Sequence, residues 1–175
     1  ETLLVAGAAS GVGVVSVQIG KFLGAKVIGV SRSAAKLEKL KAVGLDIGIA
    51  AAGGGFADKV LAATGGQGVN LAINLVGGTA FPDCVRSLAN QGRLAIIGYV
   101  DGQHHAEIDL ETVHGKRLQI FGVSNALLPP AQRAEAMRGF VRDLLPGYAD
   151  GRITPVIDKV FAFDELPAAK AYVES

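Results

Sequence analysis

The sequence has few of the residues that cross-link small proteins or anchor them in membranes. Its 175 residues include one cysteine, so neither an internal disulfide nor a zinc site built from several cysteines can form within the chain. Glycine or a charged residue interrupts every apolar run well before the ~18 residues that cross a bilayer. The sequence therefore predicts no membrane span, and its cysteine content is typical of a cytoplasmic protein.

Neither positively nor negatively charged residues are in excess. Lysine plus arginine is 17 and aspartate plus glutamate is 16, which gives a formal net charge of +1. Such a chain has no overall field to attract nucleic acid or an anionic membrane. We expect neither of them as a partner.

What the sequence does have is glycine and small aliphatic residues. There are 24 glycines and half of the residues are hydrophobic, but tryptophan is absent. Short apolar runs, which suit strands buried on both faces, alternate with segments of helical spacing. The runs cover residues 3–6, 26–30, 46–50, 71–75, 93–97 and 118–121. This alternation predicts an α/β fold, a Rossmann-type doubly wound parallel sheet with helices on both faces.

Helix signals lie between these runs. Helical spacing begins at Val12 and stops at Gly24, and a second helix is expected between an N-cap at Ser33 and Gly44. Residues 56–63 and 81–88 are shorter helical candidates.

The alternation stops after Pro129 and Pro130. A helix is expected over 131–145 with breaks at Gly147 and Gly151, followed by an extended run over 153–161. A last helix is expected over 164–173, with Asp164 as its cap. We therefore divide the chain into an alternating α/β region, residues 1–153, and a tail, residues 154–175.

A glycine-rich turn follows the first predicted strand. Residues 7–13, Gly-Ala-Ala-Ser-Gly-Val-Gly, lie where the pyrophosphate of a dinucleotide meets the amides of a helix N-terminus. Small residues there let the phosphate approach the backbone. The strict GxGxxG pattern is not met, because Ser16 stands where the helix is expected to pack on the strand. An ordinary tight turn is the alternative interpretation.

The end of the second predicted strand indicates which dinucleotide is bound. Domains that prefer NAD carry an acid there for the ribose hydroxyls, but no acid occurs between Gly13 and Glu38. Ser31, Arg32 and Lys36 occupy the region instead, and cationic side chains suit a 2′-phosphate. We predict NADPH as the cofactor; the alternative is a solvated basic helix start.

Other catalytic patterns are absent from the sequence. No tyrosine stands four residues before a lysine, as short-chain dehydrogenases require, and neither a P-loop nor a Gly-x-Ser-x-Gly elbow occurs. His104 and His105 lie near acids, but adjacent side chains in a loop rarely converge on a metal. Cys84 lies in an apolar stretch that suits a core thiol. We assign no metal site and no catalytic residue.

Several motifs, in order, resemble the coenzyme domain of zeta-crystallin-like quinone oxidoreductases in the medium-chain dehydrogenase/reductase superfamily. They are Ala8-Ala9-Ser10-Gly11-Val12-Gly13, Val17-Gln18-Ile19, Gly24-Ala25-Lys26-Val27-Ile28, Thr64-Gly65-Gly66-Gln67-Gly68-Val69, Asn74-Leu75-Val76-Gly77-Gly78, Gly92-Arg93-Leu94, Ile97-Gly98 and Gly151-Arg152-Ile153-Thr154-Pro155-Val156-Ile157. The resemblance covers nearly the whole chain. Ser10 departs from it by replacing a usual glycine, and Asn70 and Asn74 stand where aspartates are common.

The resemblance implies zinc-independent hydride transfer from NADPH to a quinone, an enone or another activated double bond. It places Ala9, Ser10, Gly11, Val12 and Gly13 at the pyrophosphate, Ser31, Arg32 and Lys36 at the 2′-phosphate, Val76 and Gly77 near the adenosine and ribose, and Ile97, Gly98, Tyr99, Gly122, Val123 and Ser124 along the nicotinamide. It also implies a GroES-like catalytic domain before Glu1, with residues 1–153 as the dinucleotide-binding Rossmann domain and residues 154–175 as a tail that returns to the GroES-like domain. The chain is therefore expected to be a fragment that binds the cofactor without turnover.

Residues 118–123 form an expected edge strand that, by analogy, pairs with its copy in a homodimer. Two other functions stay open. One is a non-catalytic NADP(H)-binding sensor or assembly module, and the other is the coenzyme domain of a zinc-type alcohol dehydrogenase.

Overall fold

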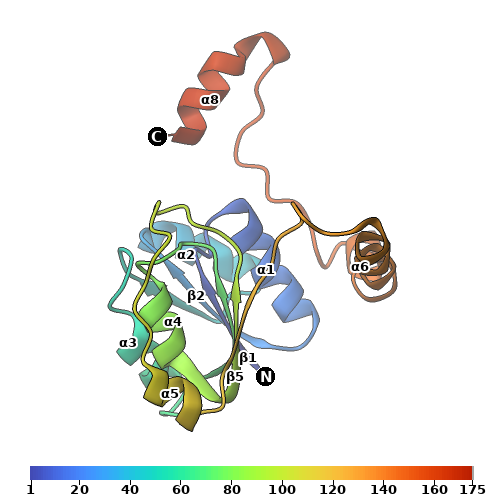
Figure 1. The fold of residues 1–175 in the computed structure, drawn as a ribbon. Coiled ribbons are helices and arrows are strands. Elements are labelled where there is room, and N and C mark those ends of the chain that lie inside the picture. The colour runs from blue at the N-terminus through green and yellow to red at the C-terminus, as the bar shows by residue number, and fades with distance from the viewer. Residues whose placement is uncertain (175) are drawn as a thin grey trace.

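Six parallel strands form one sheet in the order β3-β2-β1-β4-β5-β6 in the computed structural model, which describes residues 1–174 (Figure 1). The strands are β1 (Thr2–Ala6), β2 (Lys26–Ser31), β3 (Ile47–Ala50), β4 (Val69–Asn74), β5 (Leu88–Ile96) and β6 (Gln119–Gly122). The chain moves outward from β1 to β3, then returns to β4 on the other side of β1. The strand order reverses between β1 and β4, and α/β sheets of this type bind ligands in the crevice outside the carboxyl ends of the strands at such a reversal. The predicted fold class is confirmed.

Helices cover both faces of the sheet. On one face α1 (Gly11–Phe22) and α2 (Ala34–Leu40) bury Val17, Leu37 and Leu40 against the strands. On the other face α3 (Ala57–Ala63), α4 (Phe81–Ser87) and α5 (Leu110–Gly115) contribute Val60 and Cys84. Each fully buried aliphatic side chain stabilises the fold by about 1.5–3 kcal/mol, so these two apolar layers hold the sheet in place.

The predicted start and stop signals of α2 are confirmed. The Ser33 hydroxyl accepts the Lys36 N–H at 3.2 Å, and a 3-10 turn, η1 (Lys41–Val43), carries the helix to Gly44. Gly44 has a φ of 105°, a left-handed conformation that glycine adopts without strain. The chain thereby reverses into β3.

The carboxyl-terminal helices differ from the prediction. The helix after Pro129 breaks at Leu144, between α6 (Pro130–Asp143) and α7 (Leu145–Ala149). The prediction that Gly147 breaks the helix is wrong, because Gly147 lies inside α7. It is buried there, and an added Cβ would lie 2.8 Å from the Phe22 ring of α1. Glycine is needed at this position for close packing on α1.

The tail stands apart from the sheet in Figure 1. Thr154 is held to α1, where the Gln18 side chain donates to the Thr154 carbonyl at 2.9 Å and accepts its N–H at 2.8 Å. The extended run over 153–161 forms no strand. Asp164 is not a cap: it lies inside a 3-10 turn, η2 (Phe163–Glu165), ahead of α8 (Leu166–Glu174), and the Glu165 carboxylate accepts the Ala162 N–H instead. No helix within residues 1–174 is long and apolar enough to cross a bilayer.

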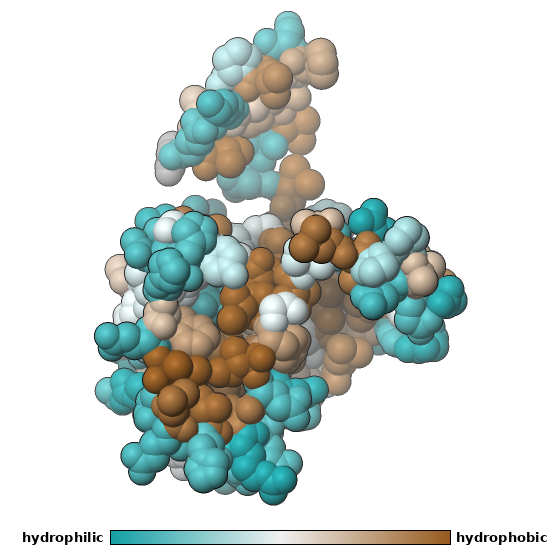
Figure 2. All heavy atoms as spheres, in the orientation of Figure 1, coloured by the Kyte–Doolittle hydropathy of each residue, from teal (hydrophilic) through white to brown (hydrophobic). Residues whose placement is uncertain are grey.

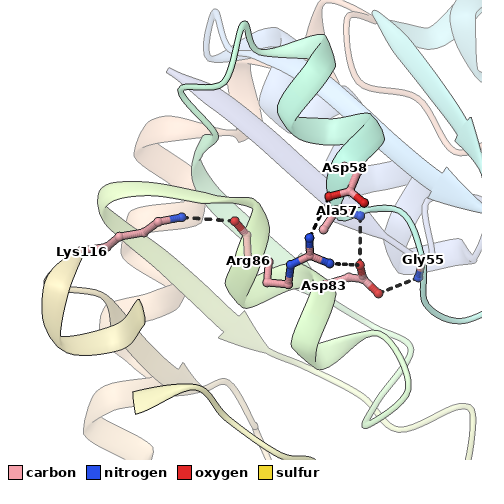
Figure 3. A network of polar contacts seen from close by, with 6 residues as sticks. All are labelled: Gly55, Ala57, Asp58, Asp83, Arg86 and Lys116. Atoms are coloured by element: carbon pink, nitrogen blue, oxygen red, sulfur yellow. Dashed lines mark hydrogen bonds and ion pairs between the residues drawn. The ribbon is translucent and has the colours of Figure 1, made fainter. Parts of the chain in front are cut away.

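A carboxylate from α4 supports the start of α3. Asp83 is buried and accepts the Gly55 N–H at 2.7 Å and the Ala57 N–H at 2.9 Å (Figure 3). Phe56, the residue at the N-cap of α3, has no side-chain oxygen to do this. Beside it, Arg86 pairs with exposed Asp58 at 2.7 Å. Asp83 therefore fixes the glycine-rich loop that joins β3 to α3.

Asp83→Ala is expected to lower the free energy of unfolding by about 2–4 kcal/mol, because it leaves two backbone donors without their acceptor. The matched control is Asp58→Ala, which removes the other carboxylate of the cluster from an exposed ion pair and should change stability little. Urea unfolding of both variants measures the difference. Equal losses would show that Asp83 does not act as a cap.

Candidate functional site

The glycine-rich turn lies at the carboxyl edge of the sheet, at the crevice beside β1. The N–H groups of Gly7 and Ala8 both donate to the Val30 carbonyl of β2, at 3.0 and 2.9 Å. The turn is therefore fixed to the end of β2, and α1 begins at a defined position above β1. Its first free amides point toward the edge where an anionic ligand would be stabilised.

Ser10 caps α1. Its hydroxyl donates to the Gly7 carbonyl at 2.8 Å and accepts the Gly13 N–H at 3.1 Å. The Ser10 hydroxyl thus donates its hydrogen within the turn. This explains why serine can replace a glycine here without disrupting the turn. Ser10, Gly11 and Val12 are exposed, Ala9 is half-buried and Gly13 is buried.

Gly13 and Gly20 let α1 pack closely on the sheet. A Cβ on Gly13 would lie 2.2 Å from the Gly7 carbonyl oxygen, and one on Gly20 would lie 2.6 Å from the Leu3 side chain. The prediction that Ser16 fills the packing position is wrong. Ser16 is half-buried, and its hydroxyl donates to the Val12 carbonyl one turn earlier. Spacing alone did not reveal which small residue faces the strand.

The basic residues predicted at the end of β2 are open to solvent. Arg32 and Lys36 are exposed and, within residues 1–174, form no ion pair, while Ser31 is half-buried and its hydroxyl accepts the Ser33 N–H at 3.3 Å. No acid lies beside them in the sequence before Glu38, which pairs with Lys41 at 2.7 Å. Two cationic side chains are therefore available to a phosphate at this edge.

Asn74 shapes the turn that holds Val76 and Gly77. Its side-chain oxygen accepts the N–H groups of both residues, at 2.9 and 3.0 Å, and its amide donates to the Gly77 carbonyl at 2.9 Å. An aspartate here would accept but not donate, so asparagine closes the turn on itself. Asn70, the other departure from the family pattern, accepts the Thr2 N–H of β1 at 2.7 Å.

The residues predicted along the nicotinamide line a cavity of about 660 Å³ beyond β5 and β6. Its lining comprises Ile96, Ile97, Tyr99, Gly122, Val123, Ser124, Asn125, Leu127, Leu128, Pro129 and Gln132. Gly98 is the one predicted residue outside it, and an added Cβ there would lie 3.2 Å from the Leu75 carbonyl. The sequence prediction missed the wall from 125 to 132, because a loop carries no periodic signal. A smaller hollow of about 350 Å³, between α2 and β3, contains none of the predicted residues.

The chain offers few groups for proton transfer or metal binding at this edge. The Tyr99 and His104 rings are in contact, with centroids 5.1 Å apart. Burial strongly raises the pKa of the Cys84 thiol, with a smaller contribution from Asp83, so this sulfur is protonated at neutral pH. Within residues 1–174, no three histidine, cysteine, aspartate or glutamate side chains are grouped closely enough to hold a metal ion.

Comparison with known proteins places this architecture in a family. The family model described as zinc-binding dehydrogenase matches residues 11–141. The chain belongs to this family. The description names zinc, and residues 1–174 contain no group of three side chains that could hold it.

Two of the similar curated proteins carry reductase or oxidoreductase names. The chain is 30% identical over 166 residues to acryloyl-coenzyme A reductase of Metallosphaera sedula, which covers 95% of this chain and 45% of that protein. It is 30% identical over 178 residues to quinone oxidoreductase-like protein 2 of Bos taurus, which covers 99% and 49%. The chain thus spans about half the length of these curated relatives.

A solved structure of mycobacterial Rv1454c complexed with NADPH is also similar. It superimposes with a TM-score of 0.76 at 28% identity, over 90% of this chain and 49% of that one. The cofactor prediction agrees with this neighbour. The individual roles assigned to Ser31, Arg32, Lys36 and the other site residues stay predictions.

Proposed function

We propose that this chain is the NADPH-binding domain of a reductase that transfers hydride to an electron-poor double bond, in an enone, an enoyl thioester or a quinone. The observation that carries the proposal is the arrangement of three features along one edge of the sheet. These are the capped N-terminus of α1, the cationic Arg32 after β2 and Lys36 in α2, which form no ion pair within residues 1–174, and the cavity beyond β5 and β6. Across the sheet from β2 through α1 to the cavity, their order is that of the 2′-phosphate, pyrophosphate and nicotinamide of one extended dinucleotide.

Each feature has a role in binding and orientation. The α1 amides bind the pyrophosphate, and Arg32 with Lys36 binds the 2′-phosphate through charge-assisted hydrogen bonds. Val123, Leu127 and Leu128 give the ring end of the site an apolar lining. NADPH, when bound, supplies the hydride, and the protein supplies its position.

The substrate class follows from chemistry and from the relatives' names. Hydride adds to the electron-poor carbon of an activated double bond, and we propose an acceptor of this kind. Acryloyl thioesters and quinones share this property, and proteins named for each are similar to the chain. We propose that a second domain completes the substrate pocket, and that the tail, 154–175, leads toward it with exposed Val156, Ile157 and Val160.

Parallel calorimetric titration of the chain with NADPH and NADH tests the proposal. NADPH should bind at least about tenfold more tightly, because only it presents a dianion to Arg32 and Lys36. Equal affinity for the two would overturn the 2′-phosphate assignment. Binding of neither would mean that the chain is no independent cofactor-binding unit.

We also propose that β6 forms a dimer interface. Its outer edge pairs with no strand in residues 1–174, and Phe121 and Val123 are 43% and 46% exposed. Figure 2 shows hydrophobic side chains gathered along the segment between the sheet and α6. A second copy would continue the sheet and cover this surface.

Phe121→Lys is expected to convert a dimer into a monomer, because it places a charge within the surface that the second copy would cover. Light scattering after gel filtration measures the mass. The matched control is Val160→Lys, which adds the same charge at an exposed apolar site in the tail. A monomeric wild-type chain would contradict the interface.

A further inference from the structure

The connection from β5 to α5 folds back onto the turn that follows β4. The Asp101 N–H donates to the Val76 carbonyl at 3.0 Å, and the Gly78 N–H donates to the Gln103 carbonyl at 2.9 Å. Tyr99 and Gly102 close a tight turn between these contacts, with the Gly102 N–H 3.0 Å from the Tyr99 carbonyl. Two loops that are distant in sequence therefore form one unit at the carboxyl edge of the sheet.

The Asp101 carboxylate is the polar centre of this unit. One oxygen accepts the Thr79 N–H at 2.9 Å and the Thr79 hydroxyl at 2.6 Å, and the other accepts the Gln103 N–H at 2.9 Å. Burial by itself raises the pKa of Asp101, but these hydrogen bonds outweigh it, and the pKa lies below its usual value. The side chain is ionised at neutral pH, and its negative charge strengthens the hydrogen bonds that hold the two loops together.

The position of Asp101 also explains why residue 77 is a glycine. A Cβ on Gly77 would lie 2.0 Å from one Asp101 carboxylate oxygen, and the φ of Gly77 is +126°, which side chains rarely adopt. The turn therefore approaches the carboxylate as closely as the backbone permits. Val76 and Gly77 belong to the adenosine side of the proposed site, whereas Tyr99, two residues before Asp101, lines the cavity on the nicotinamide side.

We infer that Asp101 is a positioning residue that fixes the distance between the adenosine side and the nicotinamide side of the cofactor site. The inference rests on the proposed function, because it assumes that one dinucleotide spans both. Asp101 acts through Val76, Gly77 and Tyr99 and does not contact the reacting atoms. The affinity of a ligand that contacts both sides depends on this distance, whereas the affinity of a ligand that contacts one side does not.

The experiment compares two ligands on the chain and on Asp101→Asn. NADPH occupies both sides, whereas adenosine 2′,5′-bisphosphate occupies the adenosine side alone. Asp101→Asn replaces one accepting oxygen with an NH2 group that cannot accept from Thr79 or Gln103. NADPH affinity should fall at least about tenfold and bisphosphate affinity less than about twofold, as measured by calorimetry.

Three further variants separate positioning from stability. Asp109→Asn is the matched control, since Asp109 accepts from Glu111 and Thr112 at the start of α5, in the same connection but outside the site. It should leave both affinities unchanged. Thr79→Val should weaken NADPH selectively, and Thr79→Ser, which keeps the hydroxyl, should restore it.

The outcomes are distinct. If the wild-type chain binds neither ligand, the proposed function fails. If it binds both, and Asp101→Asn weakens them equally or leaves them unchanged, the positioning role is wrong while the proposed function stands. A selective loss for NADPH, absent in Asp109→Asn, supports the inference.

Discussion

Arg32→Glu is expected to weaken NADPH binding by at least about 100-fold and to change NADH binding less than about threefold. The substitution removes a guanidinium that can bind the 2′-phosphate through two hydrogen bonds and puts a carboxylate in its place. NADH lacks that phosphate, so it loses no contact. Because Arg32 is exposed and forms no ion pair within residues 1–174, its replacement should leave the fold intact.

Calorimetric dissociation constants for both cofactors check this expectation. Lys39→Glu is the matched control, because it makes the same change of charge on an exposed residue of α2. A long-range field would affect both variants alike, whereas a direct contact affects Arg32→Glu alone. Equal losses of NADPH and NADH in Arg32→Glu would refute the assignment of the 2′-phosphate to this residue.

Gly13→Ala is expected to destabilise the chain by about 3 kcal/mol or more and to abolish cofactor binding. The added Cβ would lie 2.2 Å from the Gly7 carbonyl oxygen and 2.8 Å from the backbone of Ala8. Backbone atoms cannot relieve such a clash by changing rotamer, as a side chain can. Relief requires α1 to move away from the turn, which breaks the Ser10 cap and costs packing on the sheet.

Gly11→Ala is the control for Gly13→Ala. An added Cβ at Gly11 would meet no atom within 4 Å, and alanine favours the helix more than glycine does. This variant should be as stable as the wild-type chain or more so. Urea unfolding of both variants measures the contrast in stability, and NADPH titration of Gly13→Ala measures the loss of binding. A Gly13→Ala chain with wild-type stability would contradict the close approach of α1 to the turn.

The parts of the fold that the sequence predicted are those with a local physical cause. Buried parallel strands need continuous apolar runs, and Ser33 and Gly44 mark the limits of a helix by hydrogen bonding and backbone conformation that act within a few residues. Right-handed crossovers of such units place the helices on both faces of the sheet, as predicted.

The parts that it did not predict depend on contacts between distant segments. Asp83 accepts hydrogen bonds from Ala57 and Gly55, which lie 26 and 28 positions earlier in the sequence. Asp101 accepts from Thr79, 22 positions earlier. No periodicity or spacing reports such pairs. The same reason applies to Gly147, which looked like a helix breaker but packs on Phe22. In the candidate site, the turn and the strand ends could be predicted, while the apolar wall at 127–129 and the roles of Asn74 and Asp101 could not.

The central place of β1 affects how the chain folds during synthesis. β1 pairs with β2 on one edge, but its other edge pairs with β4, which ends at Asn74. A ribosome adds roughly 5–20 residues per second, so the roughly 40 residues between the ends of β2 and β4 take roughly 2–9 s to make. During that interval β1, whose residues 3–6 are buried in the folded chain, has one open edge. An open apolar edge can pair with another strand, so β1 is exposed to mispairing until β4 is made.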